Sequence, residues 1–259
     1  MIVDDNFQYD HLDSFIRQFT SQFWLERRWT FEFHISNNAM SYLICPQRKM
    51  QLNTFDQNVC EDLVQQSNHF IKLSMTNHSS IEWASSFMNK FSPIMSTIQF
   101  RELHISCAKL SFDIFVRILE LIPHLELLDV SFLPVRQWSN LSEEDLEQLH
   151  CISNKNKIVK VRLWMDLELL QFLMNMCPRM EYLEVRWIEE KDLEMLIRTI
   201  LTKSSSCIRR LHSLQCHILN GTDKLIETIQ QMINTEKLLS DHTILRCENK
   251  ISLHWKVHS

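Results

Sequence analysis

Apolar and polar residues follow two alternating patterns along most of this 259-residue chain. Six segments carry the spacing Leu-x-x-Leu-x-Leu, and their first apolar residues are Phe70, Phe100, Leu125, Ile158, Met180 and Leu211. In each segment the last apolar positions are two apart, which is the period of a β-strand that buries one face. The spacing therefore predicts six short strands.

Between these segments, apolar residues recur three and four positions apart, as on one buried face of a helix. These stripes predict helices near residues 112–119, 146–152, 169–176, 193–201 and 225–233. Ser142, with Asp145 three residues later, resembles a capping box at the start of the second helix. Because a strand and a helix of this size cannot bury their apolar faces alone, successive units must stack on one another. We therefore predict an α/β fold, an irregular solenoid of alternating strands and helices.

The two ends of the chain have different patterns. Near the N-terminus, a helical stripe over residues 12–23 precedes two further candidate strands at residues 29–35 and 40–45. Near the C-terminus, alternation over residues 251–255 predicts a last strand. An open stack of repeats exposes its core at both ends, so these segments are interpreted as caps. The predicted organisation is one structural domain with an N-terminal cap (1–55), a solenoid (56–218) and a C-terminal cap (219–259).

The amino-acid composition argues against several classes of function. The chain contains a single glycine, Gly221, which disfavours the glycine-rich turns that cradle phosphates and dinucleotides. The formal net charge of −5 argues against nucleic-acid binding. No apolar run has the roughly 18 to 20 residues of a bilayer-spanning helix, and residues 1–10 lack the basic and apolar start of a signal peptide. We therefore expect an intracellular protein, in the cytoplasm or nucleus, that binds neither nucleic acid nor membrane.

The eight cysteines are scattered without the close pairs of a zinc site, so we expect reduced thiols and no metal. The candidate catalytic combinations are Cys107 with His104 and Cys216 with His217, which lie close together in sequence. A catalytic thiol needs a base within reach, and the sequence shows no glycine-flanked nucleophile turn. We predict that the chain is not an enzyme and uses no cofactor. A Cys/His-dependent hydrolase is the alternative.

In each predicted strand, the residues that flank the second and third apolar positions point away from the core. In register they form three rows on the concave face of the sheet. The first row is Lys72, Glu102, Leu127, Lys160, Tyr182 and Ser213. The second row is Ser74, His104, Asp129, Arg162, Glu184 and Gln215. The third row is Thr76, Ser106, Ser131, Trp164, Arg186 and His217.

Two neighbouring strands in these rows gather six candidate partner-binding residues, namely Lys160, Arg162, Trp164, Tyr182, Glu184 and Arg186. Trp, Tyr and Arg are enriched at binding hot spots because they combine a large contact area with directed polar contacts. The hypothesis is that this surface binds a partner protein of acidic character. The alternative is a solvated sheet face on which Glu184 pairs with Arg162 or Arg186 and stabilises little.

The six Leu-x-x-Leu-x-Leu strands and the helices between them resemble leucine-rich repeats, in particular the long, helix-backed kind. In regular leucine-rich repeats an asparagine follows the last apolar position and lines the turns. Here such places hold other residues, for example Ala108 and Leu133. The resemblance therefore implies a leucine-rich-repeat-like solenoid that is irregular and lacks the asparagine ladder.

A second resemblance rests on short stretches at residues 11–17, 23–24, 152–158, 238–244 and 253–256. In these stretches the chain resembles the C-terminal part of certain invertebrate F-box proteins, whose substrate-binding half is a degenerate leucine-rich repeat. In that family the F-box begins with a Leu-Pro pair and docks on the adaptor Skp1 and, through it, on a cullin ubiquitin ligase. The repeats hold the protein substrate. No Leu-Pro pair stands near Met1.

The resemblance therefore implies a non-catalytic protein-binding module, similar to the substrate receptor of a ubiquitin ligase. Skp1 and cullin are implied as partners only where a longer parent chain supplies the F-box. The alternative is a repeat-only scaffold that is unconnected with ubiquitination.

Overall fold

The structure, a computed structural model, describes residues 2–3, 29–36, 39–46, 71–77, 100–135, 142–155, 157–204, 208–219 and 223–256. Its strands are β1 (Ile2–Val3), β2 (Trp29–Ser36), β3 (Ala39–Pro46), β4 (Ile71–Asn77), β5 (Glu102–Cys107), β6 (Leu127–Phe132), β7 (Lys160–Trp164), β8 (Tyr182–Glu189), β9 (Ser213–Leu219), β10 (His242–Cys247) and β11 (Lys250–Trp255). Its helices are α5 (Phe112–Leu121), α6 (Glu143–Lys155), α7 (Leu167–Met176), α8 (Glu190–Ser204) and α9 (Asp223–Thr235).

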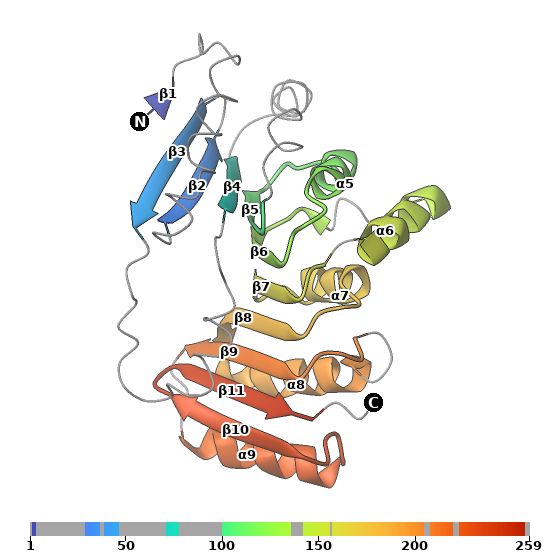
Figure 1. Cartoon of the computed structure of the whole chain (residues 1–259). Coiled ribbons are helices and arrows are strands. Elements are labelled where there is room, and N and C mark those ends of the chain that lie inside the picture. The colour runs from blue at the N-terminus through green and yellow to red at the C-terminus, as the bar shows by residue number, and fades with distance from the viewer. Residues whose placement is uncertain are drawn as a thin grey trace.

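Within the described residues, the eleven strands form one sheet in the order β1-β3-β2-β4-β5-β6-β7-β8-β9-β11-β10 (Figure 1). The run from β2 through β4 to β9 is parallel. At both ends of this run the pairing becomes antiparallel, through β3 on one side and β11 on the other. The prediction of an α/β fold is confirmed, with a sheet that is mostly parallel.

The six strands predicted from the Leu-x-x-Leu-x-Leu spacing are β4 to β9, and the five helical stripes are α5 to α9. The candidate strands near the N-terminus are β2 and β3, and the last predicted strand is β11. The sequence pattern missed the two-residue strand β1, and it also missed β10. In β10 the apolar residues Ile244 and Leu245 are adjacent, so apolar and polar positions do not alternate clearly along this strand. In the structure Ile244 is half-buried and Leu245 is exposed. The predicted helical stripe at residues 12–23 and the predicted boundary at residue 55 lie outside the described residues.

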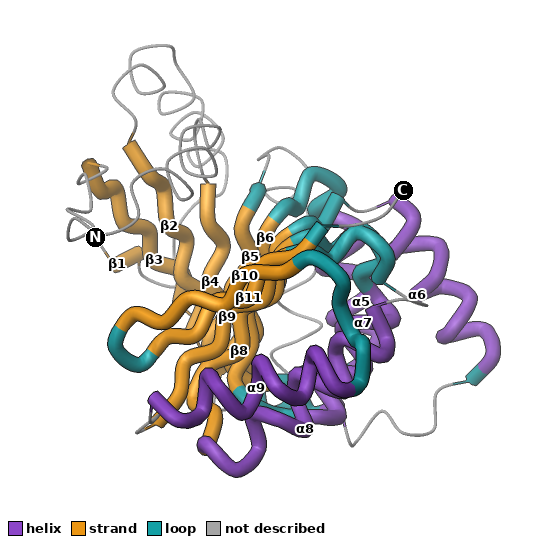
Figure 2. Tube along the Cα trace, turned by 90° about the horizontal axis from the view of Figure 1, so that it is seen from below, coloured by secondary structure: helices purple, strands orange, loops and turns teal. Residues whose placement is uncertain are grey.

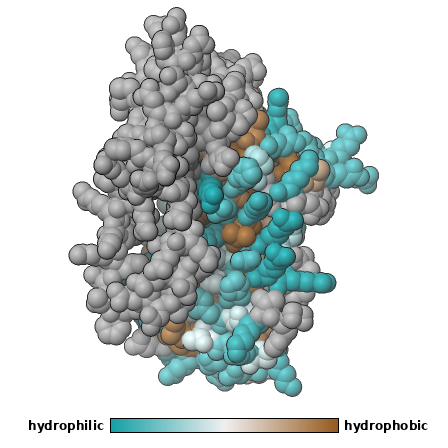
Figure 3. Space-filling view, viewed as in Figure 1, coloured by the Kyte–Doolittle hydropathy of each residue, from teal (hydrophilic) through white to brown (hydrophobic). Residues whose placement is uncertain are grey.

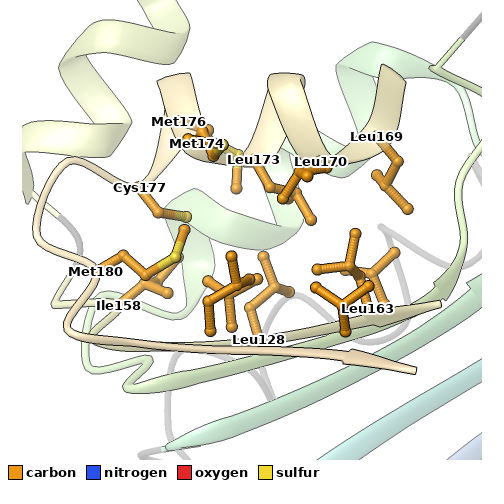
Figure 4. Close-up of a cluster of buried hydrophobic side chains, with 14 of the residues drawn as sticks. Leu128, Ile158, Leu163, Leu169, Leu170, Leu173, Met174, Met176, Cys177 and Met180 are labelled. Carbon is orange, nitrogen blue, oxygen red and sulfur yellow. The ribbon is translucent and has the colours of Figure 1, made fainter. Parts of the chain in front are cut away.

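The helices lie along one face of the sheet, as the view from below shows (Figure 2). Between the two layers, apolar side chains of strands and helices pack into one continuous core. In its central part, Leu170 and Leu173 of α7 point toward Leu163 of β7 and Leu128 of β6 (Figure 4). All four side chains are fully buried. Since burial of a leucine stabilises by about 1.5 to 3 kcal/mol, this layer accounts for why the strands and helices form together.

Two helix starts are fixed by side-chain caps. At α6, the backbone N–H of Asp145 donates to Ser142 Oγ at 3.2 Å, and the N–H of Ser142 donates back to Asp145 Oδ2 at 2.8 Å. This reciprocal pair confirms the predicted capping box. At α7, Asp166 Oδ1 accepts from the backbone N–H groups of Glu168 and Leu169 at 2.9 and 3.0 Å. In the view of Figure 3, the surface of the described residues is mainly hydrophilic, with small separate apolar patches.

The strand register confirms two of the three predicted rows. Every neighbouring pair of the first row, from Lys72–Glu102 to Tyr182–Ser213, is aligned, and so is every pair of the second row, from Ser74–His104 to Glu184–Gln215. Register is fixed so well because a slip of one residue would turn every buried side chain of a strand to the wrong face.

The third row is correct only in part. Thr76 aligns with Ser106, and Trp164 aligns with Arg186. Ser106, however, aligns with Phe132, so the prediction of Ser131 at this position was wrong. A second register shift lies between Val185 and Ile188 of β8 and interrupts the row before it reaches His217. Both errors have the same cause, because an extra residue in one strand offsets the alternation that follows it.

Candidate functional site

The structure brings all six predicted residues together on β7 and β8. Lys160 aligns with Tyr182, Arg162 with Glu184, and Trp164 with Arg186. On both strands the intervening side chains, such as Val161 and Leu183, are buried in the core. Because side chains alternate across a strand, the six residues lie on the opposite face of the sheet, away from the helices. We call this the outer sheet face.

Glu184 lies at the centre of this group and is only 7% exposed. The Nε–H of Arg186 donates to its Oε1 at 2.8 Å, and the hydroxyl of Tyr182 donates to its Oε2 at 3.3 Å. Arg162 Nε lies 2.9 Å from Oε2, and His217 Nε2 lies 3.2 Å from Oε1. These last two nitrogens are at ion-pair distance but are not aligned for a hydrogen bond. One carboxylate thus holds side chains from three strands.

The contacts continue across the sheet to β6 and β5. Both terminal nitrogens of Arg186 lie 3.4 Å from the carboxylate oxygens of Asp129. Asp129 Oδ1 in turn lies 3.6 Å from His104 Nδ1. Toward β9, Gln215 Oε1 shares the single proton of the Tyr182 hydroxyl with Glu184 Oε2. We call the acidic side chains Asp129 and Glu184, together with the arginines and histidines that contact them, the polar cluster. Its members are His104, Asp129, Arg162, Glu184, Arg186 and His217.

Both carboxyls of the polar cluster are stabilised in their charged form. Burial by itself raises the pKa of Glu184, but the hydrogen bond from Arg186 and the charge of Arg162 outweigh it, so its pKa is lower than usual. For Asp129, burial is likewise outweighed, here by His104 and Arg186, and the pKa is lowered. Burial lowers the pKa of His217 despite the charge of Glu184, which leaves its imidazole neutral at neutral pH.

This pairing changes the expected electrostatics of the outer sheet face. Arg162 and Arg186 supplied most of the positive charge on which the hypothesis of an acidic partner depended. In the structure each guanidinium lies against the carboxylate of Glu184, and Arg186 also against that of Asp129. The positive charge is therefore largely balanced within the cluster.

Trp187, which the sequence did not single out, lies next to Trp164. The two ring centroids are 5.9 Å apart, and the ring planes are inclined by 51°. Simple alternation along β8 would turn Trp187 to the core, on the same side as Val185. The register shift between Val185 and Ile188 instead leaves it 56% exposed. We call Trp164 and Trp187 the tryptophan pair.

The two candidate Cys/His combinations do not form catalytic pairs. On β5, Cys107 is buried on the core side, where its thiol donates to the carbonyl oxygen of Met75, while His104 lies on the outer sheet face. On β9, Cys216 and His217 also occupy opposite faces. Burial raises the pKa of the Cys216 thiol far above neutral pH, which keeps it protonated.

Among the described residues, no three His, Cys, Asp or Glu side chains are grouped so that they could hold a metal ion. The described helices include none that is long and apolar enough to cross a membrane. Compared with family models, curated proteins and solved structures, the chain gives no match.

Proposed function

We propose that the chain is a non-catalytic protein-binding module that holds a partner protein on the outer sheet face. The binding residues are the six predicted from the sequence, Lys160, Arg162, Trp164, Tyr182, Glu184 and Arg186. The observation that carries the proposal is their alignment in three neighbouring pairs on β7 and β8, away from the helices. Tryptophan, tyrosine and arginine at the centre of one surface are the typical composition of a binding hot spot.

The polar cluster supports this role through its rigidity. Arg186 is held by Glu184 and Asp129 at once, and Tyr182 is held by Glu184 and Gln215. Binding to side chains that are already ordered costs less conformational entropy than binding to side chains that become ordered only in the complex. Since the guanidiniums are already paired, we expect recognition through aromatic area and hydrogen bonds more than through an acidic partner's charge.

We further propose that the stacked strand–helix units are an irregular leucine-rich-repeat-like solenoid with capped ends. Within the described residues, the alternation of β5 to β9 with the helices α5 to α8 and the spacing of the buried residues in these strands support this proposal. The short stretches that resemble F-box proteins favour a substrate-receptor role in ubiquitination, with Skp1 and cullin reached through an F-box on a longer chain. A repeat-only scaffold is the alternative. A Cys/His-dependent hydrolase has little support, because the cysteine and histidine of each pair face opposite sides of the sheet.

Affinity capture tests the binding role. The baits are the wild-type chain, an Arg162→Ala/Trp164→Ala variant of the outer sheet face, and a Gln171→Ala/Asn175→Ala variant as control. Gln171 and Asn175 are exposed on α7, on the helical side of the same unit. We expect a protein that wild type and control recover and the first variant loses, with the same dependence when that protein is purified and titrated by calorimetry.

Recovery of the same proteins by all three baits would contradict the assigned surface. Recovery of Skp1 and cullin by a chain that carries the F-box would support the ligase role. Their absence from that experiment would leave the repeat-only scaffold as the better description.

A further inference from the structure

The described sheet ends in two edge strands of very different length. One edge is β1, which has two residues, and the other is β10, which has six and pairs with β11 alone among the described strands (Figure 1). An edge strand presents backbone N–H and C=O groups to which another strand can bind, and proteins limit this with short edges, bulges, prolines and lysines. β10 contains neither proline nor lysine, and its six residues pair with β11 without a register shift. The β10 edge therefore lacks the usual protection.

The backbone of β10 directs part of its hydrogen-bonding groups away from β11. Just beyond the paired residues, the N–H of Lys256 donates to the carbonyl oxygen of Asp241 at 3.2 Å. In an antiparallel pair, residues that bond to the neighbouring strand alternate with residues whose N–H and C=O point the other way. Leu245, four residues after Asp241, therefore faces β11 with its backbone groups. Its neighbour Ile244 directs its own N–H and C=O to the edge of the sheet.

The outer face of β10 carries exposed, uncharged side chains. Ile244 packs against the core, so the alternate residues lie on the outer face, and they are Thr243, Leu245 and Cys247. Leu245 is 40% exposed, and the residue directly opposite it on β11 is the polar Ser252. Arg246 is half-buried, and its Nε–H donates to the carbonyl oxygen of Glu248 in the same hairpin at 3.0 Å. An exposed leucine on an edge without lysine or proline is typical of a strand that pairs with another chain.

We propose that two copies of this chain associate by antiparallel pairing of their β10 strands around a two-fold axis at Leu245. A two-fold interface uses the same surface of both copies, so the strand must be complementary to itself. In this register Leu245 lies opposite Leu245 of the second copy, and Thr243 lies opposite Cys247. Across the new interface these are non-hydrogen-bonded pairs, in which facing side chains lie closest together. Each exposed leucine is thus covered by the other.

Backbone direction and charge select this register. An axis between two residues would set Ile244 opposite Leu245, whose backbone groups point to different sides, so the axis passes through a residue. An axis at Arg246 would bring two like charges together, which is unfavourable. An axis at Ile244 would place Leu245 opposite the more polar Thr243. The axis at Leu245 avoids both and also brings His242 level with the carboxylate of Glu248 of the second copy.

The size of the contact predicts weak association. A strand of six residues is about 20 Å long. One pair of such strands covers less than the roughly 800 Å² per partner of a standard stable interface. We therefore expect a dissociation constant of about 10 to about 100 µM. The interface is separate from the binding residues on β7 and β8, so it goes beyond the proposed function and does not depend on it.

Sedimentation equilibrium of the full chain from about 1 to about 500 µM tests the proposal. We expect wild type to change from monomer to dimer over this range. Leu245→Lys places two lysines opposite each other at the axis, and it should weaken dimerisation at least about tenfold. The control Met195→Lys adds the same charge at an exposed apolar residue of α8 and should dimerise as wild type does. Circular dichroism verifies that both variants are folded.

A disulfide tests the register. In Thr243→Cys the new thiol lies opposite Cys247 of the second copy, near enough for a bond between the copies. Within one copy, residues 243 and 247 are about 13 Å apart along the strand and cannot be bridged. Oxidation with diamide should therefore yield covalent dimers on a non-reducing gel. The control Thr243→Cys/Cys247→Ser keeps the other cysteines and should yield clearly fewer.

Four results would overturn the proposal. They are a chain that stays monomeric at the highest concentration, a dimer that Leu245→Lys does not weaken, assemblies that grow beyond the closed dimer, and equal cross-linking with and without Cys247. Binding of an added extended peptide to β10 of a chain that stays monomeric would assign the edge to a foreign strand. Loss of partner capture through Arg162 and Trp164 would contradict only the proposed function, because those residues lie outside β10 and β11.

Discussion

Arg186 and Glu184, two residues apart on β8, are joined by a hydrogen bond of 2.8 Å on the outer face of the sheet. Residues with this spacing point to the same side of a strand, so their contact is built into the alternation of β8. Arg186 also reaches Asp129, which is 57 residues away in the chain. A local pair and a long-range pair thus meet at one guanidinium, and the stability of the outer sheet face depends on both.

The first prediction concerns the loss of the central carboxylate. Glu184→Ala leaves Arg162, Arg186 and Tyr182 without their shared partner on a half-buried surface. We expect the free energy of unfolding to fall by about 2 to 3 kcal/mol, since hydrogen bonds to charged groups contribute about 1.5 to 3 kcal/mol. Denaturant titration measures the change.

The matched control is Glu236→Ala, which removes a carboxylate from an exposed ion pair with Arg198. Screening by water makes such exposed pairs weak, so this variant should lose clearly less stability. If the two variants were equally stable, the polar cluster would not stabilise the sheet.

The second prediction concerns the stability of the folded chain at acidic pH. Glu184 and Asp129 have pKa values below their usual 4.5 and 3.8 in the folded chain. The unfolded chain therefore takes up protons first as the pH falls, and the stability contributed by both carboxylates is complete above their usual pKa and is lost below it. We expect Asp129→Asn to be less stable than wild type at neutral pH and the difference to shrink on acidification.

Unfolding of both proteins at several values between about pH 7 and about pH 3 measures this difference. Glu102 has the opposite effect; its pKa is raised mainly by burial, which both proteins share, and in smaller part by the charge of Asp129. A difference that stays constant over the whole range would show that the carboxylate of Asp129 is not the cause.

The third prediction concerns the backbone at Trp187. Because its φ is 62°, the position suits glycine better than alanine. We expect Trp187→Gly to be more stable than Trp187→Ala by about 1 kcal/mol, although glycine normally destabilises a strand. Thermal unfolding of the two variants is the measurement. Greater stability of the alanine variant would mean that the left-handed conformation is not retained in solution.

The fourth prediction concerns the core between α7 and the sheet. Leu173 is fully buried above the strands (Figure 4). Leu173→Ala should destabilise the chain by about 2 to 5 kcal/mol, because it removes apolar contacts and leaves a cavity. Leu173→Met keeps most of the volume and should cost less than about 1.5 kcal/mol. Equal denaturation midpoints for the two variants would contradict this packing.

Much of the fold could be predicted from the chain itself. The pairs Leu103/Ile105 and Leu183/Val185 are buried and two apart, so each of their strands has one core face and one outer face. This rule was sufficient to align Arg162 with Glu184 and Lys160 with Tyr182. It failed at Ser131 and near His217, because a bulge adds a residue without leaving a clear trace in the hydrophobic pattern.

The sequence by itself determined the order of β4 to β9 and α5 to α9, the core side of these strands up to their register shifts, and the gathering of six polar and aromatic residues on β7 and β8. These features follow from periodicity, which is local and is enforced by burial. Only the tertiary structure decided that Arg186 is neutralised by Asp129 and that Trp187 turns outward beside Trp164. Those relationships depend on distances between strands and on one strained backbone angle, and neither is encoded in the spacing of residues along the chain.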